Sequence, residues 1–369
     1  MSHNIEDYIL LNTVETLGFK KLEKLLDVFK GTSRILKAKK SELVTVDGID
    51  NNLAEKIANL DKKQISKELR IMSKNNVRAV SIFDDGYPEN LKTIYSPPIL
   101  LYVKGEIRPE DSDAVAIVGT RQPSHYGMST CERLAYQLAS MGITVISGLA
   151  RGIDTMAHRG AVKSGRTIAV LGSGLNYIYP SENKRLAEEI CEGGALVSEF
   201  PMDTPPYRFN FPRRNRVICG LSLGVVVVEA SGKSGSLITA NFALEENREL
   251  FAVPGQADSA KSKGSNNLIK QGAKLVEDVD DIIAEIENHL KYKDIRQREK
   301  PKTVSISASA LTEDEKRIKN FLSYEPLYID ELAKKCNMNA GKISTLLLNL
   351  ELKNVIKELP GKNFILNKE

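Results

Sequence analysis

Six short apolar runs alternate with helix-type segments through the middle of the chain, and this alternation restricts the possible fold more than any other feature. Each run is almost continuously apolar, as strands are when both faces of a sheet are covered. Stretches with helical spacing separate them, for example STCERLAYQLASMG at 129–142. The pattern predicts the α/β class, with a Rossmann-like, doubly wound parallel sheet over residues 69–288. The expected strands are AVAIVG (114–119), ITVISG (143–148), TIAVLG (167–172), ALVSEF (195–200), GVVVVEA (224–230) and ELFAVPG (249–255).

Residues 1–68 have the pattern of several short helices. Leu22, Leu25 and Leu26 recur at helical spacing, and a tight turn at Gly48 joins two further helical stretches. This arrangement resembles a helix-hairpin-helix unit, whose turn can offer backbone N–H groups to a phosphate. Asp50 stands where such units carry a second glycine and brings negative charge. The substitution favours packing or partner docking, with DNA contact as the alternative.

The C-terminal part of the chain divides into a linker and a small domain. Residues 289–310 are charged and then small and polar, without periodicity, which predicts a linker. Residues 311–369 show three helices and a hairpin turning at Pro360–Gly361, the winged-helix pattern. The last of these helices would normally read DNA. Here it carries Lys342 among several leucines, so protein contact or packing and direct nucleic-acid contact both stay open. These leucines are Leu346, Leu347, Leu348 and Leu350.

The net charge is only +4 on 369 residues, so any anion-binding surface must come from local clustering of charge. The four cysteines stand singly, without a CxxC pair, and this predicts neither a zinc site nor a disulfide framework. We expect no metal and no cofactor. The N-terminus lacks signal-peptide features, and no apolar run approaches the roughly 20 residues of a membrane helix. We therefore expect a cytoplasmic protein that makes no membrane contact.

The residues that follow the predicted strands indicate an anion-binding surface. Nearly every strand ends in Gly or Ser before a helix, so N–H groups and positive helix ends should point into one crevice. Arg121 follows the first strand and Arg151 the second. The segment FPRRNR (211–216), which contains no acid, adds Arg213, Arg214 and Arg216. These five arginines predict a phosphate-binding surface, and the alternative is solvated arginines on loops.

Three nucleotide-enzyme motifs can be compared with the chain. A Walker A loop ending in GKS (232–234) needs a glycine at the position of Val227, and a dinucleotide fingerprint needs one at the position of Tyr177. The loop SGKSGSLIT resembles the PGGxGTxxE loop of nucleotide phosphoribohydrolases, but Thr239 stands in place of the catalytic Glu. A hydroxyl cannot replace that base near neutral pH. The pattern predicts a binding cradle without catalytic residues, at Ser234, Gly235 and Ser236.

A long polyanion suits this surface better than a mononucleotide, because five arginines exceed what one phosphate requires. Single-stranded nucleic acid offers successive phosphates, and aromatic side chains can stack its bases. Glu199 and Glu229 end apolar strands, where they could bond loop amides or orient an arginine, and His158 is expected to pack or cap. We interpret FPRRNR as a loop that grips a strand. The aromatic residues interleaved with the arginines are Tyr126, Tyr207, Phe209 and Phe211.

A series of motifs through residues 100–275 resembles the DNA processing protein A family (DprA, also called Smf). In order, the motifs are IVGTR, ISGLARGID, AVLGSGL, FPRRNR, VVVVEA, SGSLITA, FAVPG and NNLIKQGA. The resemblance implies a helix-hairpin-helix or sterile-alpha-motif-like N-terminal domain and a C-terminal winged helix. It also implies a cytosolic bacterial protein that binds and protects incoming single-stranded DNA in natural transformation and helps to load the RecA recombinase. Members form homodimers through the Rossmann-like domain, and no enzymatic activity is established for them.

The resemblance also assigns roles to residues. A dimer surface is expected at Leu268 and Ile269 in NNLIKQGA. Two other readings remain as alternatives: an enzyme of the phosphoribohydrolase-like superfamily acting on a mononucleotide, and a transcription regulator using the winged helix. The positions implied to contact DNA are Gly119, Arg121, Ser147, Gly148, Arg151, Arg213, Arg214, Asn215 and Arg216.

Overall fold

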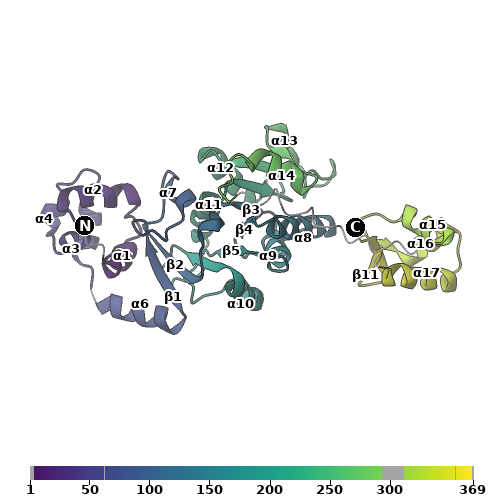
Figure 1. Ribbon diagram of the computed structural model, residues 1–369, viewed down its shortest axis with the longest axis horizontal. Helices are drawn as coiled ribbons and strands as arrows, with labels where there is room; N and C mark the ends of the chain where they lie inside the picture. Colours follow the sequence, from purple (N-terminus) through teal and green to yellow (C-terminus); the bar gives the residue numbers. More distant parts are fainter. Residues whose placement is uncertain (1–3, 62, 293–310, 354, 368–369) are drawn as a thin grey trace. The chain divides into compact units, whose positions relative to one another are not determined.

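The computed structural model of the chain describes residues 4–61, 63–292, 311–353 and 355–367. At its centre lies a nine-stranded sheet with the order β1-β2-β6-β5-β4-β3-β7-β8-β9 (Figure 1). The strands are β1 (Val77–Ser81), β2 (Leu100–Gly105), β3 (Ala114–Val118), β4 (Thr144–Ser147), β5 (Thr167–Val170), β6 (Ala195–Ser198), β7 (Gly224–Val227), β8 (Glu249–Ala252) and β9 (Lys274–Leu275). All six predicted strands are confirmed.

The sheet is parallel from β6 through β9, and β1 and β2 extend it as antiparallel strands. The chain proceeds outward from β3 through β4 and β5 to β6. It then returns to lay β7 on the other side of β3. The order therefore reverses between β3 and β7, and ligands of doubly wound sheets bind beyond the carboxyl ends of strands at such a switch point. The antiparallel strands β1 and β2 were not among the predicted strands.

Helices cover both faces of the sheet, as the continuous apolar strands require. On one face Ile190 of α10 packs in a cluster with Leu196 and Ala169. On the other face Val217 of α11 shares a cluster with Val197 and other strand residues. The helical segments of this part are α7 (Glu89–Lys92), η1 (Pro109–Ser112), α8 (His125–Ser140), α9 (Ile153–Val162), η2 (Ser181–Asn183), α10 (Lys184–Gly193), α11 (Asn210–Leu221), α12 (Ser236–Glu245), α13 (Lys263–Lys270) and α14 (Val279–Ile286).

The N-terminal helices share a hydrophobic core with the sheet. Tyr8 and Leu25 belong to the same buried cluster as Tyr102 of β2, and Figure 1 shows α1 and α6 beside β1 and β2. The predicted boundary at residue 68 falls inside α6. Asp50 caps α5, because its carboxylate accepts a hydrogen bond from the Leu53 amide (2.7 Å). These helices are α1 (Ile5–Asn12), α2 (Phe19–Phe29), α3 (Thr32–Ile35), α4 (Lys40–Leu43), α5 (Asn51–Ala58) and α6 (Lys63–Lys74).

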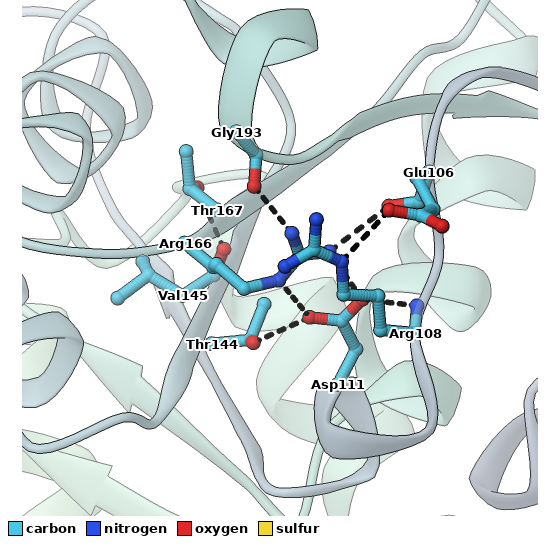
Figure 2. Close-up of polar contacts among 8 residues, drawn as sticks. All are labelled: Glu106, Arg108, Asp111, Thr144, Val145, Arg166, Thr167 and Gly193. Atoms are coloured by element: carbon cyan, nitrogen blue, oxygen red, sulfur yellow. Dashed lines mark hydrogen bonds and ion pairs between the residues drawn. The ribbon is translucent and has the colours of Figure 1, made fainter.

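A buried ion pair ties the amino ends of the parallel strands together (Figure 2). The guanidinium of Arg166 donates to both carboxylate oxygens of Asp111, at 2.9 and 2.8 Å, and to the carbonyls of Glu106 and Gly193. The Thr144 hydroxyl donates to the same carboxylate at 2.7 Å. The donors of the guanidinium are thus used inside the protein. This ion pair therefore stabilises the amino ends of the strands.

The C-terminal domain has a core of its own, in which Leu332, Ile343 and Leu347 are buried. Its three helices and hairpin confirm the predicted winged-helix arrangement. On α17, Leu347 and Leu350 are buried while Leu348 is 57% exposed, and the Lys342 ammonium lies 2.7 Å from Asp314. The elements are α15 (Glu313–Phe321), β10 (Leu327–Tyr328), α16 (Ile329–Cys336), α17 (Ala340–Leu352), β11 (Ile356–Leu359) and β12 (Asn363–Leu366), with strand order β10-β12-β11.

The predicted linker, residues 289–310, lies outside the described residues from position 293 onward. Its first residues still belong to the central domain: Leu290 is buried, and the amides of Lys291 and Tyr292 donate to the Asp113 carboxylate, each at 2.8 Å. Within the described parts of the chain, no helix has the length and apolar character needed to cross a membrane.

Candidate nucleic-acid interface

The segment FPRRNR forms the first turns of helix α11, so the prediction that it is a loop was wrong. Pro212 is compatible with this, because the first turn of a helix needs no amide hydrogen from the chain. Helical geometry then separates the side chains that the sequence places together. Phe211 and Arg214 lie on one side of α11, and Arg213 and Arg216 lie on another. The arginine side chains of this segment therefore lie in two different environments, one on each side of α11.

Arg214 points into the protein and is only 4% exposed. Its guanidinium donates to the Gly148 carbonyl at 2.6 Å and to the Val170 carbonyl, which joins the ends of β4 and β5. A Cβ on Gly148 would overlap this guanidinium, so Gly148 provides its space. Arg214 therefore fixes the strand ends from inside, and the assignment of Arg214 and Gly148 to DNA contact stays a prediction. Asn215 supports them, since its Oδ1 accepts from Arg214 at 3.1 Å.

Buried titratable groups surround Arg214. Burial lowers the pKa of Arg214 to about 10, while the nearby Asp154 carboxylate acts in the opposite direction. Burial also raises the pKa of Asp154, and the charge of Arg214 partly offsets that effect. Beneath them, burial lowers the pKa of His158 to about 3, and its Nδ1 lies 2.7 Å from the Thr167 hydroxyl. His158 is thus a neutral packing residue, as predicted.

Two other arginines have acidic partners that the sequence segment did not reveal. Arg216 is 18% exposed at its side chain and bonds the Glu199 carboxylate and the Ser96 carbonyl. Glu199 thus orients an arginine, as the sequence suggested. Arg151 pairs with Glu182, but both side chains are at least half exposed. Solvent screens such a pair, so Arg151 stays accessible to a polyanion.

An exposed cation and two aromatic rings meet beyond the ends of β3 and β5. The Arg121 guanidinium lies 5.5 Å from the centre of the Phe211 ring, within the range of cation–π attraction. The Tyr179 ring lies 5.9 Å from Phe211 at an angle of 46°. Gly172 permits this packing, because a Cβ there would come within 2.8 Å of the Phe211 ring. We call Arg121, Phe211 and Tyr179 the aromatic–arginine cluster.

Further aromatic surface lies next along the chain. Tyr207 and Phe209 stack with their ring centres 5.3 Å apart and their planes 9° apart, and they are 50% and 56% exposed. Tyr177 and Tyr179 are 42% and 44% exposed. The sequence prediction included Tyr207 and Phe209 but missed the two tyrosines of SGLNYIYP. Their position directly after a predicted strand was the signal that could have found them.

Close backbone approach shapes the switch point between β3 and β7. The Thr120 amide donates to the Glu229 carbonyl at 2.7 Å, which ties the two strand ends together. A Cβ on Gly119 would lie 2.7 Å from Ile153. Gly152 has φ of +77°, and a Cβ there would overlap the Thr120 carbonyl. Gly119 and Arg121 therefore sit on a backbone that is fixed before any ligand binds.

Ser147 and the predicted cradle at Ser234, Gly235 and Ser236 differ in solvent exposure. Ser147 is fully buried and its hydroxyl donates to the Ile117 carbonyl at 2.6 Å, and its expected DNA contact stays a prediction. In the cradle, Gly235 is exposed and precedes α12 without a side-chain cap. The hydroxyls of Ser234 and Ser236 lie 2.8 Å apart. The Ser236 amide donates to the Ser234 hydroxyl at 3.3 Å and the Leu237 amide to the Ser234 carbonyl at 3.1 Å, so these first amides of α12 are bonded within the loop.

The predicted dimer surface is only partly accessible. Leu268 is 6% exposed and belongs to the central hydrophobic cluster, and its assignment to a dimer surface stays a prediction. Ile269 is half-buried against the same cluster. The side chain of Thr239, at the position of the hydrolase carboxylate, is buried as well. Among the described residues, no group of three or more His, Cys, Asp or Glu side chains could hold a metal ion.

Comparisons with known proteins agree with this architecture. Residues 78–287 match the family model described as DNA recombination-mediator protein A, and residues 303–362 match the DprA winged helix domain. Protein Smf of Escherichia coli (strain K12) is 39% identical over 316 residues, which cover 85% of this chain and 84% of that protein.

Two solved structures are similar over most of their own length. The X-ray structure of DNA processing protein A from Streptococcus pneumoniae has a TM-score of 0.67 and 36% identity, and the match covers 77% of this chain and 99% of that one. The second is DNA processing protein A from Helicobacter pylori, whose structure concerns its single-stranded DNA binding mode. It has a TM-score of 0.54 and 30% identity, and the match covers 59% of this chain and 99% of that one. The chain belongs to the DprA/Smf family of DNA processing proteins.

Proposed function

We propose that this protein binds single-stranded DNA, without sequence preference, across the carboxyl ends of β3, β4 and β5. The aromatic–arginine cluster carries the proposal: the exposed Arg121 guanidinium, the exposed Tyr179 ring and the half-buried Phe211 ring stand together at the topological switch point. A guanidinium can bind a phosphate while a ring next to it stacks on a base. The related protein from Helicobacter pylori, described for its single-stranded DNA binding mode, supports the same function here.

Single strands suit this surface better than duplexes. Stacking on Tyr179, Phe211 or the Tyr207–Phe209 pair requires bases whose faces are open, and duplex bases are already stacked. Every base has such a face, so stacking does not select a sequence. Arg121 and Arg151 would contact successive phosphates, together with backbone N–H groups at Gly119 and Gly235. Arg214, Gly148 and Ser147 would hold this surface in place from beneath.

The biological role that we propose follows from membership of the DprA/Smf family. In the cytosol the protein would protect incoming single-stranded DNA during natural transformation and would help to load the RecA recombinase onto it. It would act as a binding protein rather than as an enzyme. A homodimer formed near Ile269 would present two strand-binding surfaces and raise the effective concentration of each for a long strand.

The first test measures binding to fluorescent oligothymidine and to a matched duplex over a range of salt concentrations. We expect single-strand preference, and a loss of about tenfold in affinity for Arg121→Ala, since it removes a charge-assisted contact. Arg108→Ala is the control, because Arg108 is half exposed and precedes β3, at the amino ends of the parallel strands. Duplex-favoured binding, or equal affinity of Arg121→Ala and wild type, would contradict the proposal. RecA loading is tested next, by the lag of RecA-dependent ATP hydrolysis on the bound strand.

A further inference from the structure

A second pocket lies on the other side of α11, between the N-terminal helices and the central domain. It has a volume of about 460 Å³ and is bordered by the segment joining α1 to α2, the loop 96–99, the end of β6 and the start of α11. Arg213 and Arg216 line it, whereas Arg121 and Phe211 do not. The pocket is therefore separate from the aromatic–arginine cluster.

One side of this pocket suits a phosphate. Helix α2 begins there at Gly18, and no side chain caps its first amides. The uncapped start of an eleven-residue helix carries free N–H groups and a partial positive charge. Arg213 adds a full charge, whereas the charge of Arg216 is paired with Glu199. The Lys21 ammonium donates to the carbonyl of Thr16 on the pocket border (3.4 Å). Glu15 also borders the pocket, but it is exposed to solvent.

A buried carboxylate oxygen in the same pocket lacks a partner. Glu199 is 9% exposed, and its Oε2 accepts from Arg216. Its Oε1 is buried without a hydrogen bond among the described residues. An unpaired buried acceptor costs free energy, and a ligand N–H group that reaches it would remove that cost. A ligand of this pocket should therefore carry a hydrogen-bond donor as well as an anionic group.

We propose that this pocket binds one nucleotide, with its phosphate at the start of α2 beside Arg213 and an N–H group of its base at Glu199. The volume lies in the range of small-ligand pockets, roughly 300–1,000 Å³, and exceeds what a phosphate alone would fill. Apolar residues also line the pocket, including Pro98, Ile99 and Phe200, and they suit a sugar and a base. The nucleotide is either free or part of a strand that continues past α11.

Substitutions at Gly18 test the pocket without loss of folding. Gly18 has open space around the position of a Cβ and φ of −83°, ψ of 170°, so a capping side chain is tolerated. Gly18→Asp would cap α2 and stabilise it, yet would place a carboxylate where the phosphate binds. Gly18→Asn is the matched control, because it caps the helix without adding charge. Glu199→Gln tests the other end by replacing one carboxylate oxygen with an amide group.

Binding is measured on the full chain with guanosine monophosphate, whose base offers N–H donors, and separately with oligothymidine and a mixed-sequence oligonucleotide. If a free nucleotide is the ligand, Gly18→Asp should weaken guanosine monophosphate binding about tenfold or more relative to Gly18→Asn. If the pocket takes part of a strand, the same comparison should show the loss with an oligonucleotide. Glu199→Gln should weaken whichever ligand binds.

Equal affinities of Gly18→Asp and Gly18→Asn for every ligand would overturn the inference. That outcome is distinguishable from failure of the single-strand proposal, because Arg121→Ala reports on the other side of α11. Arg121→Ala could weaken oligothymidine binding while Gly18→Asp leaves it intact. That result would support the proposed function and would show that this pocket does not bind the strand.

Discussion

Substitution of Arg214 by glutamine distinguishes an internal role for this arginine from phosphate binding. The change removes two charge-assisted hydrogen bonds to the Gly148 and Val170 carbonyls, each worth about 1.5–3 kcal/mol. It also leaves the buried Asp154 without the charge that offsets its desolvation. Partial relaxation and the remaining polar amide recover some of this loss. Breaking a buried charge pair from one side costs about 3–5 kcal/mol, and we expect Arg214→Gln to destabilise the protein by that amount.

The matched variant is Arg213→Gln, one residue earlier on α11. Arg213 is half-buried, and its guanidinium lies 5.2 Å from the centre of the Phe200 ring, a contact worth about 0.5–1 kcal/mol. We therefore expect Arg213→Gln to cost about 1 kcal/mol or less. The difference should appear in urea unfolding followed by circular dichroism, and in thermal unfolding as a gap of roughly 10 °C. Equal stability of Arg214→Gln and wild type, combined with loss of strand binding, would refute an internal role for Arg214.

Three further predictions concern single side chains. Tyr179→Ala should lower affinity for oligothymidine at fixed salt by about 1–3 kcal/mol, whereas Tyr179→Phe should keep it; equal affinities would remove Tyr179 from the interface. Burial lowers the pKa of His158 from 6.5 to about 3, so below pH 6.5 the unfolded chain binds a proton that the folded one does not. Stability should therefore fall by about 2 kcal/mol at about pH 5. Urea titrations should show less acid sensitivity in His158→Gln, and an unchanged pH slope would contradict this cause. Asp50→Ala should cost about 1 kcal/mol through the lost cap of α5 and leave oligothymidine affinity unchanged.

The central strands were predictable because strands that are buried on both faces are almost continuously apolar, and such runs are visible in the sequence. Strands β3 to β8 are short and apolar, and β3, β4, β5 and β8 each reach a glycine within three residues of their carboxyl ends. Strand β1 was harder to find, since VRAVS is short, contains a charged residue and lies at the sheet edge. Its partner β2 carries LLYV, a four-residue apolar run, and so could have been predicted. An edge strand forms by pairing with a neighbouring strand, and a single sequence does not show which strands pair.

The candidate site was less predictable, because charge in a sequence does not say where a side chain points. FPRRNR contains three arginines, and a loop would have exposed them all. Once the segment is assigned to a helix, position 214 falls in line with Val217, Ile218 and Leu221, at spacings of three, four and seven. That line is the buried face of α11. Helical assignment of the segment was therefore the missing step.

The division of the arginines predicts a modest salt dependence. Each phosphate neutralised on a single strand contributes about −0.7 to the slope of log affinity against log salt. Five free arginines would give about −3.5, but Arg214 is buried and Arg216 is held by Glu199. Arg121, Arg151 and Arg213 remain, and they would give about −2. A measured slope near −2 would show that most of the affinity comes from stacking and backbone contacts. A slope near −3.5 would mean that Arg214 and Arg216 leave their internal partners when the strand binds.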